Sequence, residues 1–145
     1  MKRLFLIAVL VLCCSTVEAR RWFGGGGYTG DTSPPTATEI AKVKDGLPVV
    51  NAQRKRIGLP PFRFDAALWE HARNQAIRQA RWGTCTHGGC QMGDIVNTGA
   101  EGVGTAEPGK PGTWNSCCWT ENYRYAAAAY VDKGGQRYCC IHVRR

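Results

Sequence analysis

Residues 49–87, VVNAQRKRIGLPPFRFDAALWEHARNQAIRQARWGTCTH, decide the fold because they contain the longest clearly bounded helix signal in the chain. Asp65 stands at an N-cap position, where its carboxylate accepts a hydrogen bond from an otherwise unpaired backbone N–H. No Pro or Gly follows until Gly83, so the sequence predicts a helix over residues 66–82. Small or apolar side chains recur every fourth residue along it, at Leu68, Ala72, Ala76 and Ala80. The alanines indicate that another element packs close to this helix.

A rigid turn precedes this helix in the sequence GLPPFRFD of residues 58–65. Gly58 can adopt the left-handed conformation that ends a helix, and the two prolines that follow prevent helical continuation. We therefore expect an earlier helix to stop near Gly58 and a short extended segment to lead into the next one.

The region upstream of the turn contains the signals for that earlier helix. Thr38 is the expected N-cap of a helix that begins at Glu39. Pro48 then either kinks this helix or takes the first position of a separate helix over residues 48–57. Both alternatives place helical structure directly before the turn.

The C-terminal part predicts a β-hairpin. Residues 123–130, YRYAAAAY, and residues 136–143, QRYCCIHV, flank the turn signal DKGG of residues 132–135. Four alanines also suit a helix, but the aromatic edges and the turn favour two antiparallel strands. In the middle of the chain, two prolines and two glycines in TAEPGKPGT, residues 105–113, predict that no helix forms there.

Residues 1–19 have the pattern of a signal peptide, with basic residues before an apolar run over residues 4–12 and small residues up to Ala19. The run is too short for a permanent transmembrane anchor. We expect secretion after cleavage at Ala19, with lipid attachment at Cys13 as the alternative. Residues 20–37 are rich in Gly and Pro and predict a flexible arm before the domain.

The chain is basic, with a formal net charge of +8. Two basic residues and one acidic residue leave with the signal peptide, so the mature chain has a charge of +7. A basic surface suits acidic partners. The arginines are spread along the chain without the aromatic interleaving of a single-strand binder, so we expect no nucleic-acid partner.

Six cysteines remain after processing, namely Cys85, Cys90, Cys117, Cys118, Cys139 and Cys140. An even number in a secreted domain predicts disulfides. Neighbouring cysteines in a strand point to opposite faces, so the adjacent pairs should find different partners. We favour a Cys85–Cys90 bond and two bonds between the 117–118 and 139–140 pairs, although the sequence does not fix the connectivity. A zinc site of Cys85, His87, Cys90 and a distant cysteine is the alternative.

Three segments of this chain resemble the first half of a CAP domain, the family of cysteine-rich secretory proteins, antigen 5 and plant pathogenesis-related proteins. They are residues 51–54, NAQR, residues 58–62, GLPPF, and residues 65–69, DAALW. The resemblance implies an α+β fold over residues 38–145, a compact α-β-α sandwich with a small antiparallel sheet, which we expect disulfides to stabilise. It also implies that Asn51 and Arg54 are packing residues.

The resemblance further implies a cavity. His87 stands where the CAP pattern has its first histidine, and Glu101, in the sequence NTGAEGV, aligns with the glutamate of the family's Gly-Glu-Asn segment in an expected loop. The sequence WNSCCW of residues 114–119 is similar to a bacterial CAP segment that ends in a second histidine, and Trp119 takes its place. An indole offers no metal lone pair. We therefore expect a degenerate cavity with no cofactor and no tight zinc site, unless His142 supplies a second imidazole.

These features together predict a non-catalytic binding module for a lipid, a peptide or a cell-surface glycan. One alternative is an envelope-associated structural protein that binds through its basic surface and aromatic arm. A second alternative is a weak hydrolase or peptidase with His87 as the base and Glu101 as its orienting partner. The hydrolase is less favoured because no serine or cysteine has a recognisable nucleophile setting.

Overall fold

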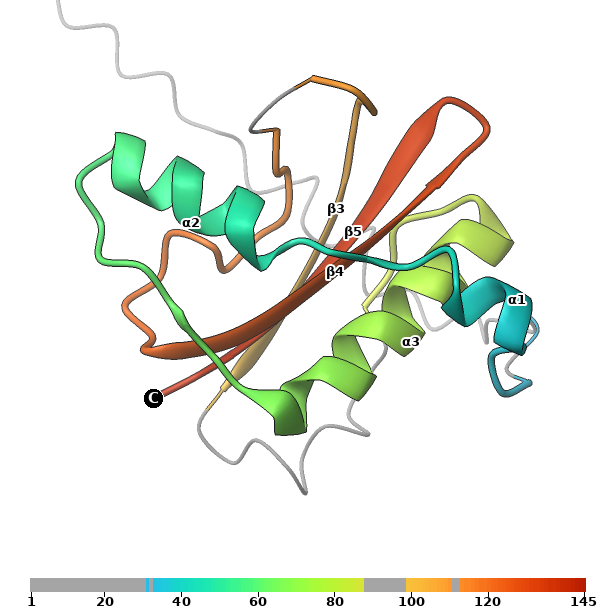
Figure 1. The fold of residues 1–145 in the computed structure, drawn as a ribbon, viewed down its shortest axis with the longest axis horizontal. Helices are drawn as coiled ribbons and strands as arrows, with labels where there is room; N and C mark the ends of the chain where they lie inside the picture. Colours follow the sequence, from blue (N-terminus) through green and yellow to red (C-terminus); the bar gives the residue numbers. More distant parts are fainter. Residues whose placement is uncertain (1–30, 32, 88–98, 111–112) are drawn as a thin grey trace, which may run out of the picture.

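The computed structural model describes residues 31, 33–87, 99–110 and 113–145. The predicted signal peptide, residues 20–30 and 32 of the glycine-rich arm, and Cys90 lie outside these residues. The described elements are α1 (Ala37–Ile40), β1 (Lys44–Asp45), α2 (Leu47–Arg56), β2 (Arg63–Phe64), α3 (Ala66–Trp82), β3 (Ala100–Ala106), β4 (Tyr125–Lys133) and β5 (Gln136–Arg144). Helices and a small, mainly antiparallel sheet confirm the predicted α+β class (Figure 1).

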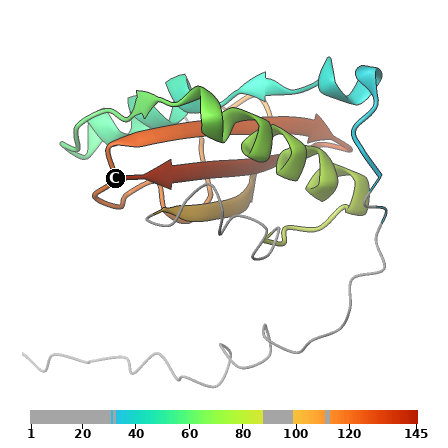
Figure 2. The same cartoon turned by 90° about the horizontal axis from the view of Figure 1, so that it is seen from below.

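The sheet has the strand order β1-β4-β5-β3, and β2 adds a short parallel pairing to β4. Figure 2 shows α3 lying along β4 and β5, with β3 at the edge of the sheet. The predicted hairpin of β4 and β5 is confirmed, and its turn contains Gly134 and Gly135 with φ of +60° and +76°. Such positive φ values at both central residues are typical of the tight turns that join antiparallel strands.

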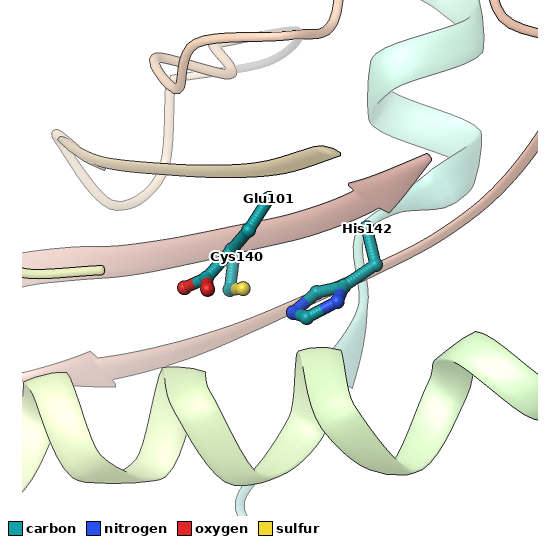
Figure 3. A group of neighbouring side chains, drawn as sticks. All are labelled: Glu101, Cys140 and His142. Atoms are coloured by element: carbon teal, nitrogen blue, oxygen red, sulfur yellow. The ribbon is translucent and has the colours of Figure 1, made fainter. Parts of the chain in front are cut away.

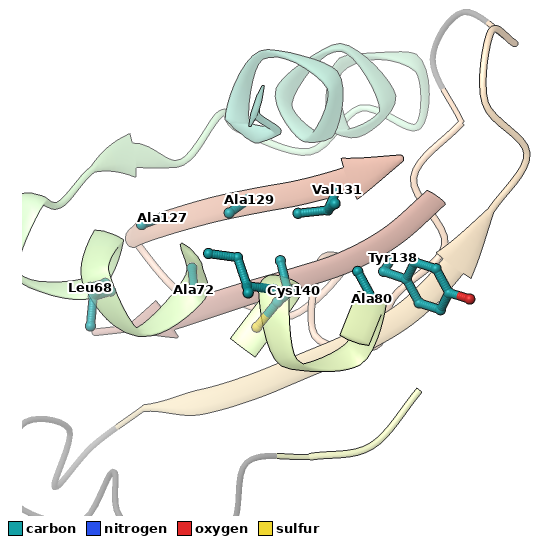
Figure 4. Close-up of a cluster of buried hydrophobic side chains, with 10 residues drawn as sticks. Leu68, Ala72, Ala80, Ala127, Ala129, Val131, Tyr138 and Cys140 are labelled. Carbon is teal, nitrogen blue, oxygen red and sulfur yellow. The ribbon is translucent and has the colours of Figure 1, made fainter. Parts of the chain in front are cut away.

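The predicted helix over residues 66–82 is confirmed with both of its ends. The Asp65 carboxylate accepts a hydrogen bond of 3.0 Å from the Ala67 N–H, and Gly83 ends the helix in the left-handed conformation with φ of +67°. The small side chains of α3 pack against alanines of β4 and against Tyr138 and Cys140 of β5 (Figure 4). Alanines on both layers let the helix approach the sheet closely, as the sequence predicts.

The first helix begins earlier than the sequence predicts. Thr36, not Thr38, caps α1: its hydroxyl accepts from the Glu39 N–H, while the Glu39 carboxylate accepts from the Thr36 N–H. This reciprocal capping box pairs two orphan donors, which a cap at Thr38 would not do. Pro48 lies in the first turn of α2, in agreement with the two-helix alternative.

A second core lies between the sheet and α2, on the face opposite α3. It contains Leu47 and Val50 of α2, Phe62, Trp114, and the side chains of β4 and β5 that alternate with those facing α3. Two α2 residues hold the turn against it, as expected. The Asn51 amide pairs with both the N–H and the C=O of Phe62, and the buried Arg54 donates to three backbone carbonyls.

The expected loop around Glu101 is a strand. Residues 100–106 form β3, which pairs with β5 over its whole length. A Cβ added at Gly104 would lie 1.5 Å from the carbonyl oxygen of Asn115, and one at Gly102 would lie 2.0 Å from that of Cys117. The glycines that suggested a loop instead allow the backbone of residues 115–117 to lie directly on the strand.

The predicted disulfide framework is wrong for the cysteines that the structure describes. Cys85, Cys117, Cys118, Cys139 and Cys140 are free thiols, and no disulfide joins described residues. Cys139 and Cys140 do point to opposite faces of β5, but each is buried in one of the two cores. The thiols of Cys117 and Cys118 lie instead against the Glu101 carbonyl of β3, the strand that neighbours β5. The expected Cys85–Cys90 bond involves Cys90, outside the described residues.

None of the described helices is both long enough and apolar enough to cross a membrane.

Candidate functional site

A cluster of chemically active side chains lies between α3 and the strands β3 and β5. Glu101 of β3 is paired across the sheet with His142 of β5, and Val103 is paired with Cys140. Side chains alternate along a strand, so Cys140 and His142 share the face toward α3. One carboxylate oxygen of Glu101, the Cys140 sulfur and one His142 ring nitrogen lie within 4.8 Å of one another (Figure 3). We call these three residues the strand cluster.

His142 is the most unusual member of the strand cluster. Its side chain is 2% exposed, and neither Nδ1 nor Nε2 has a hydrogen-bond partner among the described residues. Burial, with smaller electrostatic contributions from the neighbouring His71 and His87, lowers the pKa of His142 to about 4. The imidazole is therefore neutral at physiological pH and keeps a lone pair for an electrophile or a hydrogen-bond donor.

Cys140 is fully buried, and burial raises the pKa of its thiol well above the ordinary value. The neighbouring Cys139 faces the opposite core, where burial raises its pKa to about 12. Both sulfurs are therefore protonated thiols in the absence of a cation. Only Cys140 has an imidazole and a carboxylate beside it.

Other polar groups around α3 also lack partners. The side-chain oxygens of Gln75, Gln79 and Thr86 are buried and accept no hydrogen bond from described residues. The loop after α3 runs back along the helix, as the hydrogen bond from the Gln75 amide to the Thr86 carbonyl shows. On α3, the His71 ring centroid lies 5.9 Å from that of His142. Buried polar atoms of this kind normally bind water, a ligand or an ion.

The structure does not bring the three predicted cavity residues together. Glu101 faces α3 with the strand cluster, whereas Trp119 packs into the core on the opposite face, and its carbonyl accepts from Arg54. His87, in the segment that follows α3, is exposed, with Nε2 4.0 Å from the Cys117 sulfur. Of the three, Glu101 alone belongs to the strand cluster. Its neighbours there were predicted in other roles, Cys140 as a disulfide cysteine and His142 as a possible second imidazole of the cavity.

A second feature lies at the end of the molecule formed by the GLPPF turn and the loop before β4. It is a surface hollow of about 660 Å³ between Pro60–Arg63 and Asn122–Arg124, which Arg145 completes. The two segments are joined by a 2.9 Å hydrogen bond from the Arg63 N–H to the Arg124 carbonyl. We call this hollow the arginine cleft.

Three exposed arginines, Arg63, Arg124 and Arg145, line the arginine cleft beside Tyr123 and the two prolines. No acidic residue is among the described residues that line it. Two further hollows on the described surface differ, because one contains Glu107 and the other contains Glu39 and Asp132. The arginine cleft is therefore the one of these three in which positive charge is not offset.

Comparison with known proteins finds no family model, no curated protein and no solved structure that matches this chain. The family resemblance seen in the sequence therefore remains a proposal.

Proposed function

We propose that the domain is a secreted, non-catalytic binding module of CAP type whose arginine cleft binds an acidic glycan. The observation that carries the proposal is that Arg63, Arg124 and Arg145 all line one cleft, without an acidic residue among its described lining. Planar guanidinium groups bind carboxylate and sulfate groups through paired hydrogen bonds.

A glycan fits the cleft better than a lipid or a peptide. A lipid chain needs a continuous apolar channel, whereas exposed charged groups surround this hollow. A peptide that added a strand would need free backbone donors. The Arg63 and Arg124 N–H groups already donate to the Arg124 and Arg144 carbonyls. A sugar ring needs a flat apolar surface and separate anionic contacts, which Tyr123, the prolines and the arginines supply.

The proposed role is binding rather than hydrolysis. Most glycoside hydrolases use a pair of carboxylic acids on either side of the scissile bond. The described lining of the arginine cleft offers none. In the region of the expected CAP cavity, His87 lies against Cys117 and Trp119 lies on the other side of the sheet, which does not favour the hydrolase alternative.

The test is a titration of the protein with a uronic-acid oligosaccharide and with a neutral oligosaccharide of the same linkage. We expect the acidic ligand alone to bind, more weakly as salt is added. Replacing Arg63 and Arg124 together by alanine should weaken binding by roughly tenfold or more. Arg56→Ala is the matched control, since Arg56 is an exposed arginine at the end of α2, outside the cleft. An equal loss in the Arg56 variant would mean diffuse charge attraction and would refute the proposal.

A further inference from the structure

We propose that the strand cluster of Glu101, Cys140 and His142 is a binding site for a zinc-class divalent metal ion. The inference is independent of the arginine cleft, because the two sites share no residue and lie on different elements. The donor set also differs from the pair of histidines that the CAP resemblance implies, since neither Cys140 nor His142 matches a family motif.

The geometry suits a tetrahedral ion. Metal bonds of about 2.0 Å to nitrogen or oxygen and about 2.3 Å to sulfur place neighbouring ligands roughly 3.5 Å apart. The three donor atoms lie within 4.8 Å of one another without an ion, so a contraction of at most about 1.3 Å closes the site. Because Glu101 and His142 are direct cross-strand partners, rotation of side chains achieves this contraction while the backbone pairing stays intact.

The buried His142 ring is the independent observation that points to a ligand. Neither of its nitrogens has a partner among the described residues; an unpaired buried nitrogen costs free energy, and a metal bond to one of them removes part of that cost. The mixture of an imidazole, a thiol and a carboxylate favours zinc over magnesium or calcium, which prefer oxygen ligands alone.

Binding requires Cys140 to lose its proton. The S–H bond breaks, the sulfur lone pair bonds the ion and the proton passes to solvent, so charge balances as the dication meets the thiolate and the Glu101 carboxylate. Three protein ligands leave one coordination position for water, as in an open zinc site. His71, whose ring lies 5.9 Å from that of His142, is close enough to contact a group in that position.

Cobalt titration of the whole chain, stripped of metal and kept reduced, tests the site. Thiolate ligation of Co²⁺ gives an intense near-ultraviolet charge-transfer band, which we expect to saturate at one equivalent. Cys140→Ser should abolish the band, and Cys139→Ser should keep it. The two cysteines are adjacent and equally buried but face opposite cores, so the second variant controls for loss of a core thiol.

Two further variants make the result decisive. Glu101→Gln, at a half-buried position, should fold and bind Zn²⁺ at least about tenfold more weakly by calorimetry. His87→Ala should leave affinity unchanged. The proposal is overturned if no one-to-one metal binding occurs, in which case hydrogen bonds from ordered water would account for the buried His142 ring. It is equally overturned if the band survives in Cys140→Ser, or if His87→Ala alone abolishes it.

Discussion

Arg54 offers the most stringent test of how the fold is held together. Its side chain is 1% exposed, and its guanidinium donates to the carbonyls of Pro60, Trp119 and Glu121 while stacking on Phe62 at 3.7 Å. One side chain therefore joins α2, the GLPPF turn and the loop that leads toward the arginine cleft. Arg54→Met keeps much of the apolar stem and removes every one of these donors.

The expected loss can be worked out from the three hydrogen bonds. A hydrogen bond to a charged group contributes about 1.5–3 kcal/mol, and the cost of burying the guanidinium offsets part of the sum. We expect Arg54→Met to lower the free energy of unfolding by about 3–5 kcal/mol, because three carbonyls lose their donor. Arg54→Lys should recover only part of this loss. Its ammonium group can still donate to a carbonyl, but it cannot reach all three acceptors as the planar guanidinium does.

Urea unfolding followed by circular dichroism measures the effect, with Arg56→Met as the control on the same helix. Arg56 is exposed, so its replacement should change stability by no more than about 0.5 kcal/mol. If Arg54→Met cost less than about 1 kcal/mol, the three carbonyl contacts would not hold these segments together. The reasoning about the turn and the cleft would then fail.

Three other outcomes follow from the structure. Gly104→Ala places a methyl group against the Asn115 backbone and should lower the thermal midpoint by more than Gly109→Ala, where the left-handed φ of +79° strains alanine but no described residue beyond the chain neighbours comes within 4 Å of the new methyl; equal effects would contradict the close approach. Arg137 lowers the pKa of Asp132, so their ion pair stabilises the fold at neutral pH and is lost below about pH 4. Acid unfolding of Asp132→Asn should lack this part of the pH dependence, and an unchanged profile would count against it. Reductant should leave the thermal midpoint unchanged, since the described cysteines are free; a large fall would restore the disulfide prediction.

The sequence predicts those parts of the fold that depend on local signals. The α3 helix has a cap, a periodic stripe and a terminal glycine within one continuous segment, and the β4–β5 hairpin has a diglycine turn between two β-rich runs. β3 has no such signal. It is a strand because it pairs with β5, and its glycines leave room for the backbone of residues 115–117 to pack on it. Neither contact can be read from the local sequence of residues 100–106.

The candidate sites depend even more on contacts between distant residues. Glu101 was singled out by family resemblance. The possible metal ligands beside it, Cys140 and His142, lie on β5 and are brought next to it by the register of the β3–β5 pairing. The alternation of Cys140 and His142 along one face of a predicted strand was the available signal. Arg63, Arg124 and Arg145 are far apart in the sequence, so only the fold shows that they share one cleft.

The most direct test of the proposed function is an amide chemical-shift titration of the labelled protein with the uronic-acid oligosaccharide. We predict saturable shifts confined to Arg63, to residues 122–125 and to the C-terminal arginines, with little change at residues around His142. The neutral oligosaccharide should produce none of them. Shifts centred on residues 84–87, or spread over the basic surface without saturation, would contradict the assignment of ligand binding to the arginine cleft.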